Sequence, residues 1–289
     1  MQIDLGNSTV ILTDMGTIKE VQYMSKMNTK AHIKKLDKHR YMVEETGEIK
    51  EFKHIENRSG SVNSVRQTLK KLRYLINHNF RGKKNELFVT LTYKENMRDR
   101  ERLYRDCDKF IKKMKYHYGN IDYINVVEPQ ARGAWHCHVL MRFNDVEKIY
   151  IPNKELYDHW GHGFVKVERL HQVDNIGAYL SAYLADIELN DDTLFLAYDT
   201  QKEIKTVIVD GKEKRFVKGG RLHYYPPGIN LYRKSRGIKY PEREKMTYSR
   251  AKKRVGSHKP TFTKDMTIET ANDSDNINIL FEEYNSLRV

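Results

Sequence analysis

The chain has 289 residues, of which 39% are hydrophobic, and it carries a formal net charge of +13. This hydrophobic content supports a folded core and excludes a disordered chain. The positive charge indicates a polyanionic partner, nucleic acid before an acidic membrane surface, and the 19 tyrosines suit stacking on unpaired bases.

The two cysteines and the lack of long apolar runs bear on the compartment. Cys107 and Cys137 both fall at positions predicted to be buried, so we interpret them as small hydrophobic residues and exclude a disulfide framework. No apolar run is long enough to span a bilayer, and the amino-terminal segment lacks the layout of a signal peptide. We therefore expect a cytoplasmic protein.

The amino-terminal part, residues 1–60, predicts a β-rich extension. Its expected strands lie near residues 10–12, 18–23, 41–43 and 48–52. Residues 62–80 then carry apolar side chains at intervals of three and four, which predicts an amphipathic helix with a basic outer face. That face is either solvated or in contact with DNA, and the sequence favours neither. The helix opens the predicted core domain, residues 61–190.

The order of elements in the core domain predicts the fold class. We expect strands at 87–93 and 163–168, helices at 99–118, 153–160 and 174–187, and a two-stranded hairpin between 123 and 143. The succession β-α-β-β-α-β with one further helix is typical of a split β-α-β arrangement. The expected α+β fold is a central antiparallel sheet of this ferredoxin-like or RRM-like type. Helices would pack on one face, and the other would be open to a metal and DNA.

The hairpin holds the clearest candidate for a chemical site. From Trp135 to Phe143 the side chains alternate, so His136 and His138 share the face opposite the apolar one. Two histidines at this spacing are also common in strands without a metal. If Glu128 pairs opposite His136, however, one carboxylate and two imidazoles lie together as a metal site with two nitrogens and one oxygen.

The helix at 174–187 carries the second signal. Tyr179 and Tyr183 lie one turn apart along one margin of its apolar stripe. The opposite side has small residues such as Gly177 and Ala178, which would let another element approach closely. Tyrosines at such a margin are more often packing residues than nucleophiles, so their catalytic interpretation depends on the histidine hairpin.

Three segments in this order give the chain a family likeness: FVTLTY at 88–93, WHCHVLM at 135–141 and YLSAYLAD at 179–186. Together they resemble the HUH endonucleases, and more narrowly the two-tyrosine replication initiators of bacterial rolling-circle plasmids and single-stranded DNA phages. The resemblance covers roughly residues 87–190. It implies an enzyme that nicks single-stranded or hairpin origin DNA, forms a 5′-phosphotyrosine and a free 3′-hydroxyl, and later rejoins the strand to end replication.

The resemblance also implies roles for individual residues. Glu128, His136 and His138 match the metal ligands, and Tyr179 and Tyr183 match the paired nucleophiles.

The chain departs from the family in one respect. The family often has lysine three residues after each tyrosine, and this chain has Ala182 and Asp186 there. Lys166, on the neighbouring strand, is a candidate substitute. Asp186 is a candidate base for activating a phenol, although an exposed aspartate at a helix end is the commoner meaning.

Tyrosine attack on a phosphodiester needs both a metal and an activated phenol. A divalent ion orients the phosphate and offsets charge that develops in the transition state. Carboxylate and imidazole together can hold Mg²⁺ or Mn²⁺, and two imidazoles favour Mn²⁺. A free phenol has a pKa of about 10 and is a poor nucleophile at neutral pH, so a base or a cation must activate it.

Residues 191–255 predict a basic and aromatic extension with β-like segments at 205–209 and 214–217. Its segment GGRLHYYPPGINLYRKSRGIKYP either forms part of a DNA-reading surface or completes the fold. The candidate DNA contacts are Thr90, Thr92, Arg221, Arg233 and Arg236. Residues 256–289 are expected to form a polar flexible tail, with a short helix at 279–287.

Two alternatives stay open beside the replication initiator. A single-strand transposase or a mobilisation relaxase of the same superfamily would use the same chemistry, although such transposases commonly carry a cysteine-rich zinc module. A non-enzymatic DNA-binding regulator with structural zinc is the more distant alternative, because structural zinc usually takes four closed ligands. No phosphate-loop motif of a helicase occurs in the sequence, so an initiator would need a host helicase in trans.

Overall fold

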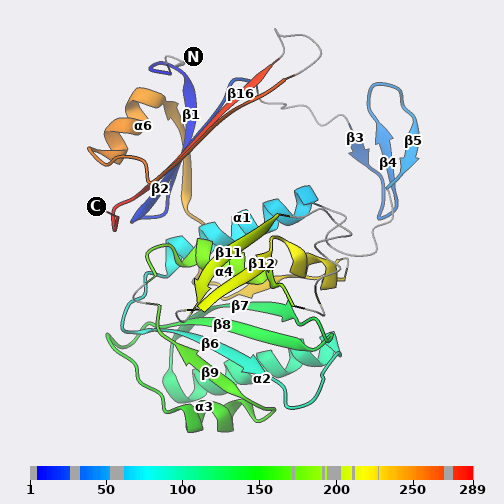
Figure 1. Ribbon diagram of the computed structural model, residues 1–289, viewed down its shortest axis with the longest axis vertical. Helices are drawn as coiled ribbons and strands as arrows, with labels where there is room; N and C mark the ends of the chain where they lie inside the picture. Colours follow the sequence, from blue (N-terminus) through cyan, green and yellow to red (C-terminus); the bar gives the residue numbers. More distant parts are fainter. Residues whose placement is uncertain are drawn as a thin grey trace. The chain divides into compact units, whose positions relative to one another are not determined.

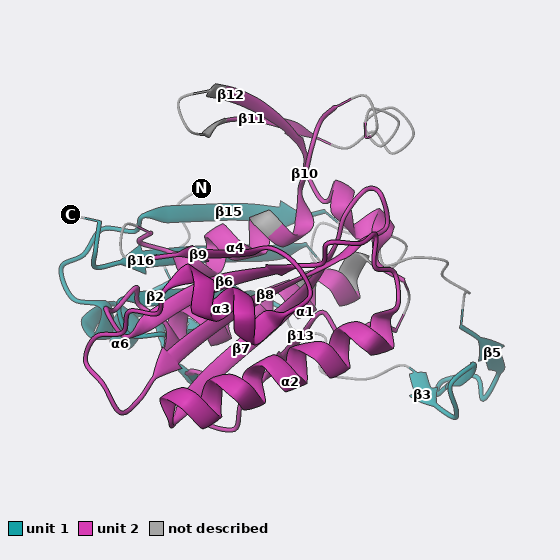
Figure 2. Ribbon diagram, turned by 90° about the horizontal axis from the view of Figure 1, so that it is seen from below, with its two compact units in different colours: residues 1–55, 242–289 teal, residues 56–241 magenta. Residues whose placement is uncertain are grey.

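The computed structural model describes residues 5–26, 33–52, 62–170, 173–190, 193, 203–209, 212–226, 228–269 and 276–288. Within these ranges, the side chains of residues 62, 63, 66, 183, 208, 209 and 212 lie outside the description. The chain divides into two compact units, residues 1–55 with 242–289 and residues 56–241 (Figure 2). The fold is α+β and its sheets are antiparallel, as the sequence predicts.

The unit of residues 56–241 is organised around a five-stranded sheet with the order β13-β7-β8-β6-β9. Its strands are β6 (Glu86–Thr92), β7 (Ile121–Pro129), β8 (Trp135–Phe143), β9 (Val165–Glu168) and β13 (Tyr232–Lys234). Its helices are α1 (Val62–Asn79), α2 (Arg100–Tyr118), α3 (Asn153–Trp160), α4 (Ile176–Ala185) and the 3-10 helix η2 (Gly220–Tyr224). The predicted succession of strands and helices is confirmed, with boundaries that differ by a few residues.

Helix α2 shows how the local sequence sets these elements. Asp99 caps its start by accepting hydrogen bonds from the N–H groups of Glu101 and Arg102 at 2.9 and 3.0 Å. Gly119 ends it at φ 77°, a conformation that favours glycine. The apolar face of α2 packs with α3 on one face of the sheet (Figure 1). The core there includes Leu103, Cys107, Phe110, Met114 and Cys137, so the predicted burial of both cysteines is confirmed.

The opposite sheet face, which carries His136 and His138, is also covered by helices. Figure 1 shows α1 and α4 on the side of the sheet away from α2 and α3. The second core consists of Leu72, Leu75, Ile76, Phe80, Phe88, Ile124, Val126, Leu140, Ile176, Leu180 and Leu184. The expectation of one fully open face is therefore wrong. The apolar stripes of α1 and α4 need burial, and this face offers apolar side chains to bury them.

Helices α1 and α4 approach each other closely at Gly177. A Cβ at this position would lie 2.6 Å from the carbonyl oxygen of Arg73 and 2.7 Å from Oδ1 of Asn77. That Oδ1 accepts a hydrogen bond from the N–H of Gly177 at 2.7 Å, and Asn77 Nδ2 donates to Asn175 Oδ1 at 3.0 Å. Asn175 caps α4 by accepting from the N–H of Ala178 at 2.9 Å. The close approach predicted for the small-residue side of α4 is confirmed.

A smaller sheet follows α4 in the same unit. It has the order β10-β12-β11 and consists of β10 (Ile187–Glu188), β11 (Ile204–Val209) and β12 (Lys212–Val217). The two β-like segments predicted from the sequence are therefore strands. They form an antiparallel ladder with each other.

The unit of residues 1–55 and 242–289 has its own sheet, with the order β14-β1-β2-β16-β15 and helix α6 (Tyr248–Val255) packed on it. Its strands are β1 (Thr9–Asp14), β2 (Ile18–Met24), β14 (Glu242–Thr247), β15 (Phe262–Ile268) and β16 (Ile277–Asn285). A second sheet holds β3 (Ile33–Lys35), β4 (Arg40–Val43) and β5 (Ile49–Glu51). The predicted amino-terminal strands are confirmed.

The carboxy-terminal segment differs from the prediction. In place of a short helix at 279–287 the structure has strand β16, which pairs with β2 from the other end of the chain. Strand β15 pairs with β16 in turn. Tyr284 is buried, and its hydroxyl donates to Glu282 Oε2 at 2.7 Å. The polar composition conceals this because the partner strand is distant in the sequence. None of the described helices is long and apolar enough to cross a membrane.

Candidate metal centre

Strands β7 and β8 form the predicted hairpin, and their register pairs Glu128 with His136. The turn between them is closed by Gly133, whose N–H donates to the carbonyl of Gln130 at 2.8 Å and whose φ is 84°. Residues with a Cβ rarely adopt this conformation, so glycine is needed here. The predicted register is confirmed, and it puts the carboxylate and the imidazoles of His136 and His138 on one face of the sheet.

These three side chains lie close enough to share one ion. One possible ligand atom from each of Glu128, His136 and His138 lies within 4.8 Å of the others, and the described residues contain no second group of this kind. Glu128 is 3% exposed and His138 is 2% exposed, whereas His136 is half-buried. The cluster is therefore sheltered on one side and accessible through His136.

Both ring nitrogens of His138 have partners. Its Nε2 faces Glu128 Oε2 at hydrogen-bond distance, and its Nδ1 lies 3.0 Å from Thr90 Oγ1. Thr90 stands there because β6 pairs it directly with His138. A hydroxyl donates or accepts, so Thr90 can satisfy Nδ1 in either tautomer and hold Nε2 toward the carboxylate. Thr90, predicted to contact DNA, instead orients an imidazole of the cluster.

The second carboxylate oxygen of Glu128, Oε1, forms an ion pair with Arg221. The same guanidinium donates to the carbonyls of Pro129 and Asp186, both at 3.2 Å. Burial opposes ionisation of Glu128, but the charges of His138 and Arg221 outweigh it, so the pKa of Glu128 lies below its usual value. The carboxylate is therefore negatively charged at neutral pH.

His136 has the opposite electrostatic setting. Burial lowers its pKa to about 4, although the carboxylate of Glu128 acts against the shift. The ring is therefore neutral at physiological pH. Its Nε2 is buried and has no hydrogen-bond partner among the described residues. Such an orphaned polar atom is costly, about 1–3 kcal/mol, and a metal ion would satisfy it.

The donors present fit a divalent metal. They offer one charged carboxylate and two imidazoles, one of them oriented by Thr90 and the other without a protein partner. This buried Glu-His-His group could bind a metal ion, and a set of three protein ligands leaves coordination positions for other groups.

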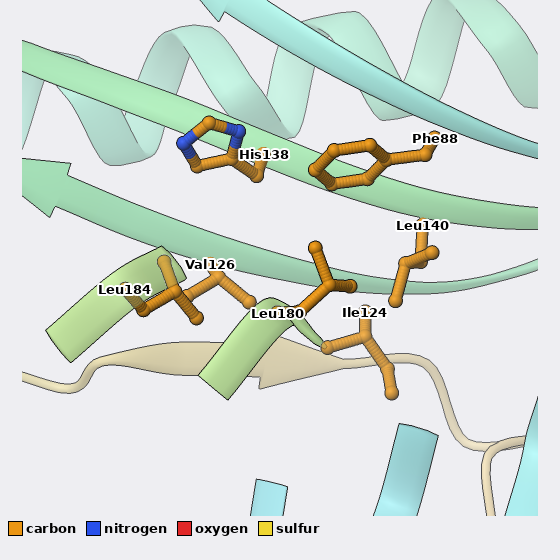
Figure 3. A pocket seen from close by; sticks show the side chains of 7 residues that line it. All are labelled: Phe88, Ile124, Val126, His138, Leu140, Leu180 and Leu184. Atoms are coloured by element: carbon orange, nitrogen blue, oxygen red, sulfur yellow. The ribbon is translucent and has the colours of Figure 1, made fainter. Parts of the chain in front are cut away.

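Helix α4 lies against the same sheet face as His138. Leu180 and Leu184 of α4 line a small apolar cavity of about 10 Å³ together with His138, Phe88 and Val126 of the sheet (Figure 3). A cavity of this size and lining is at the lower limit for one water, so we interpret it as a packing void rather than a ligand site. Its importance lies in showing which turns of α4 lie next to the cluster.

Tyr179 and Tyr183 each directly precede one of these two leucines. Tyr179 is 46% exposed. The side chain of Tyr183 lies outside the described residues, although its backbone is part of α4. The backbone of α4 therefore brings both tyrosine positions to the face that carries the cluster.

The two predicted accessory residues have other partners. Asp186 is not exposed: it is 7% accessible, forms an ion pair with Lys205 and accepts a hydrogen bond from the N–H of Gly219 at 2.8 Å. A carboxylate held in this way joins the end of α4 to the β11–β12 ladder and is a poor candidate for a base. Lys166 lies on the cluster face opposite Thr90, and its Nζ is 2.9 Å from Glu168 Oε1.

The remaining predicted DNA contacts lie in different places. Thr92 pairs with His136 across the β6–β8 ladder and is half-buried. Arg233 is on the α2 side of the sheet, with its guanidinium 3.9 Å from the ring centre of Tyr104. Arg236 is exposed just after β13. Arg233 is thus placed away from the cluster face.

Sequence reasoning missed the position of Arg221 beside Glu128. The segment that carries it completes the fold, because Tyr225 is buried and its hydroxyl donates to the carbonyl of Val127 at 2.9 Å. The only available signal was the concentration of basic and aromatic residues in that segment, which does not show which face they contact.

Comparisons with known proteins agree with this region of the chain. Among the curated proteins compared no match was found, and the comparison with solved structures gave no match either. Residues 86–188, which run from β6 to β10 and hold Glu128, His136, His138 and α4, match a family of the ORF2 type described as Replication-associated protein.

Proposed function

We propose that this protein is a replication initiator that nicks single-stranded origin DNA by metal-assisted tyrosine attack and later rejoins the strand. The observation that carries the proposal is the Glu128–His136–His138 cluster with α4 packed beside it. The family match over residues 86–188 supports a role in replication, because it spans both parts of this site. The net charge of +13 favours DNA as the partner.

Glu128, His136 and His138 would hold the metal. When bound, a divalent ion such as Mg²⁺ or Mn²⁺ would orient the phosphate and offset the charge that develops on it. Thr90 would keep the ring of His138 turned toward the site, and Arg221 would keep the carboxylate of Glu128 ionised and in place. The depressed pKa of His136 would leave its lone pair free of a proton at neutral pH.

Tyr179 and Tyr183 are the proposed nucleophiles. In the reaction the phenolic oxygen bonds to phosphorus, the bond from phosphorus to the 3′-oxygen breaks, and the 3′-oxygen leaves as a hydroxyl after it gains a proton. The products are a 5′-phosphotyrosine and a free 3′ end, so the ester bond is conserved for rejoining. Since Asp186 is held by Lys205 and Gly219, the phenol would have to be activated by another group.

A second tyrosine one turn away would end replication. The first phenol stays esterified to the 5′ end while the origin is regenerated, and the neighbouring phenol can then attack it. Strand separation would come from a host helicase in trans. A transposase or relaxase of the same superfamily would use the same residues. A zinc-stabilised regulator is less well supported, because the described part of the chain offers no fourth ligand of this type to close the site.

The test is covalent capture of DNA. The purified chain is incubated with Mn²⁺ and a random-sequence pool of single-stranded oligonucleotides labelled at the 3′ end, because the downstream fragment stays joined to the protein. A labelled protein band on a denaturing gel is expected. Tyr179→Phe and Tyr183→Phe should each retain part of it, and the double variant should lose it. Tyr116→Phe, an exposed tyrosine of α2, is the matched control.

Two results would contradict the proposal. An adduct that survives in the double tyrosine variant would mean that another residue attacks the DNA. An adduct that forms unchanged in excess EDTA, or in a His136→Ala/His138→Ala variant that still binds DNA, would mean that the cluster is not a catalytic metal site.

A further inference from the structure

One exposed aromatic side chain lies on the same sheet face as the metal-site candidate. Phe164, at the start of the edge strand β9, is 65% exposed. A single exposed apolar residue is common on protein surfaces and carries no meaning by itself. Its position relative to the cluster is what gives Phe164 a possible function.

The strand register fixes the face that Phe164 occupies. Val165, the next residue, pairs with Leu91 and is buried in the core on the α2 side. Because side chains alternate along a strand, Phe164 is on the opposite face. The N–H of Thr92 donates to the carbonyl of Phe164 at 2.9 Å, and Thr92 pairs with His136 in the next ladder. Phe164, Thr92, His136 and Glu128 therefore stand in one row across four strands.

This row sets the separation between the aromatic ring and the cluster. Neighbouring strands lie about 4.8 Å apart, so Phe164 is roughly 10 Å from His136 measured across the sheet. That separation is on the scale of one nucleotide. A strand whose phosphate lies at the cluster would therefore have a neighbouring base near Phe164.

The backbone that carries Phe164 is held firmly against β6. Gly163, at φ 154°, leaves no room for a side chain, because a Cβ there would lie 2.5 Å from both the N of Lys94 and the O of Thr92. The N–H of Lys94 donates to the carbonyl of His162 at 2.9 Å, next to the bond from Thr92. The ring of Phe164 is therefore presented from a rigid strand start, and a ligand that stacks on it need not order a loop.

The surroundings favour nucleic acid over an apolar partner. Lys166 is two residues along β9 on the same face, with its side chain 59% exposed, and it is opposite Thr90 of the cluster. A phenyl ring has no hydrogen-bonding group and can stack on any base, but only on a base that is not enclosed in a duplex. An aromatic ring beside a lysine on the face of a proposed nuclease site fits a single strand.

We propose that Phe164 is a stacking platform for an unpaired base of the single-stranded DNA whose phosphate lies at Glu128, His136 and His138. This inference rests on the proposed function, because it takes the DNA strand to cross the cluster face. It assigns to the exposed edge of β9 the task of holding one nucleotide next to the cut, and it gives a physical reason for preferring single-stranded over duplex DNA.

The experiment measures binding without cleavage. Fluorescence anisotropy with a short fluorescein-labelled oligo-dT in EDTA reports affinity for Phe164→Leu, which stays apolar but has no ring. Removing one stacked base is expected to weaken binding about 5- to 100-fold. Because no charge changes, the dependence of log Kd on log salt should keep its slope, whereas Lys166→Ala should reduce that slope. Tyr116→Leu, on the exposed face of α2, should bind as the native chain does.

A second variant observes the stack directly. Phe164→Trp should bind as tightly as the native chain, and its tryptophan emission should be quenched by the oligonucleotide. The native Trp135 and Trp160 are 6% and 2% exposed, so they contribute little to this change. Tyr116→Trp is the control and should show no quenching.

The outcomes separate this inference from the proposed function. Native-like affinity of Phe164→Leu, or unchanged emission of a Phe164→Trp variant that binds DNA, overturns the stacking platform and leaves the nuclease proposal standing. Failure of the native chain to bind oligo-dT overturns both. DNA binding through Phe164 with no covalent adduct overturns the nicking reaction alone.

Discussion

The substitution Gly177→Ala is expected to destabilise the protein although it improves helix propensity. Gly177 lies in the first turn of α4, where alanine would ordinarily stabilise the helix by about 1 kcal/mol. The structure predicts the opposite sign, because a Cβ would meet the carbonyl oxygen of Arg73 at 2.6 Å and Oδ1 of Asn77 at 2.7 Å. Backbone of α1 is one of the two obstacles, so a side-chain rotation cannot relieve the contact.

The expected magnitude follows from two opposing effects. Overpacking of this kind costs about 1–3 kcal/mol, and a weakened hydrogen bond from the N–H of Gly177 to Asn77 costs about 1 kcal/mol more. Subtracting the helix-propensity gain of about 1 kcal/mol leaves a net loss of about 1–3 kcal/mol in the free energy of unfolding. Because the clash would push α4 away from α1, the rate of covalent adduct formation should fall as well.

Urea denaturation measures the stability change, and a matched variant in the same helix supplies the control. Ser181→Ala adds no atom, removes a buried hydroxyl that has no hydrogen-bond partner among the described residues, and gains helix propensity, so it should stabilise the protein by about 0.5 kcal/mol. The loss at Gly177 should persist in an Asn77→Ala background, because the carbonyl of Arg73 remains. Native or higher stability of Gly177→Ala would refute the close approach of α1 and α4.

Three further predictions concern the cluster. Thr90→Val should lower the affinity for Mn²⁺ about 10- to 100-fold in calorimetric titration, and Thr90→Ser should restore it, because the hydroxyl orients His138. The metal-free protein should lose about 2 kcal/mol of stability between pH 7 and pH 5: unfolded His136 takes up a proton near pH 6.5, but the folded ring does so only near 4, so acid favours unfolding, and His136→Gln should not show this loss. Arg221→Gln should cost about 3–5 kcal/mol by leaving Glu128 buried without its partner, and much less in a Glu128→Gln background; equal losses in both would contradict the ion pair.

The parts of the fold that the sequence predicted correctly are those governed by short-range patterns. The β7–β8 register follows from strict alternation on one strand and from the glycine that closes a tight turn, so Glu128 could be placed opposite His136 without any structure. The core face of α2 follows from its helical period and from its caps at Asp99 and Gly119. Each of these features depends on residues within a short stretch of chain.

The parts that could not be predicted depend on contacts between distant segments. The apolar stripe of α1 was evident, but not that it covers the cluster face together with α4, because the sequence does not show which surface a stripe meets. Strand β15 has no buried residue, so its composition gives no sign of a sheet. Arg221 reaches Glu128 from a segment whose basic character suggested only a DNA contact.

The cluster and α4 are connected by more than their common sheet face. The start of α4 is held by Asn77, which accepts from the N–H of Gly177. Its end is held at Asp186, whose carbonyl accepts from Arg221, the residue that also pairs with Glu128. One guanidinium thus joins a ligand of the proposed metal to the end of the helix that carries the proposed nucleophiles. A helix fixed at both ends has little freedom to slide, so a change between Tyr179 and Tyr183 during the reaction cycle would have to come mainly from movement of the DNA strand. On this argument the second attack depends on how the strand is held next to the cut, and Phe164 is the side chain placed to hold it.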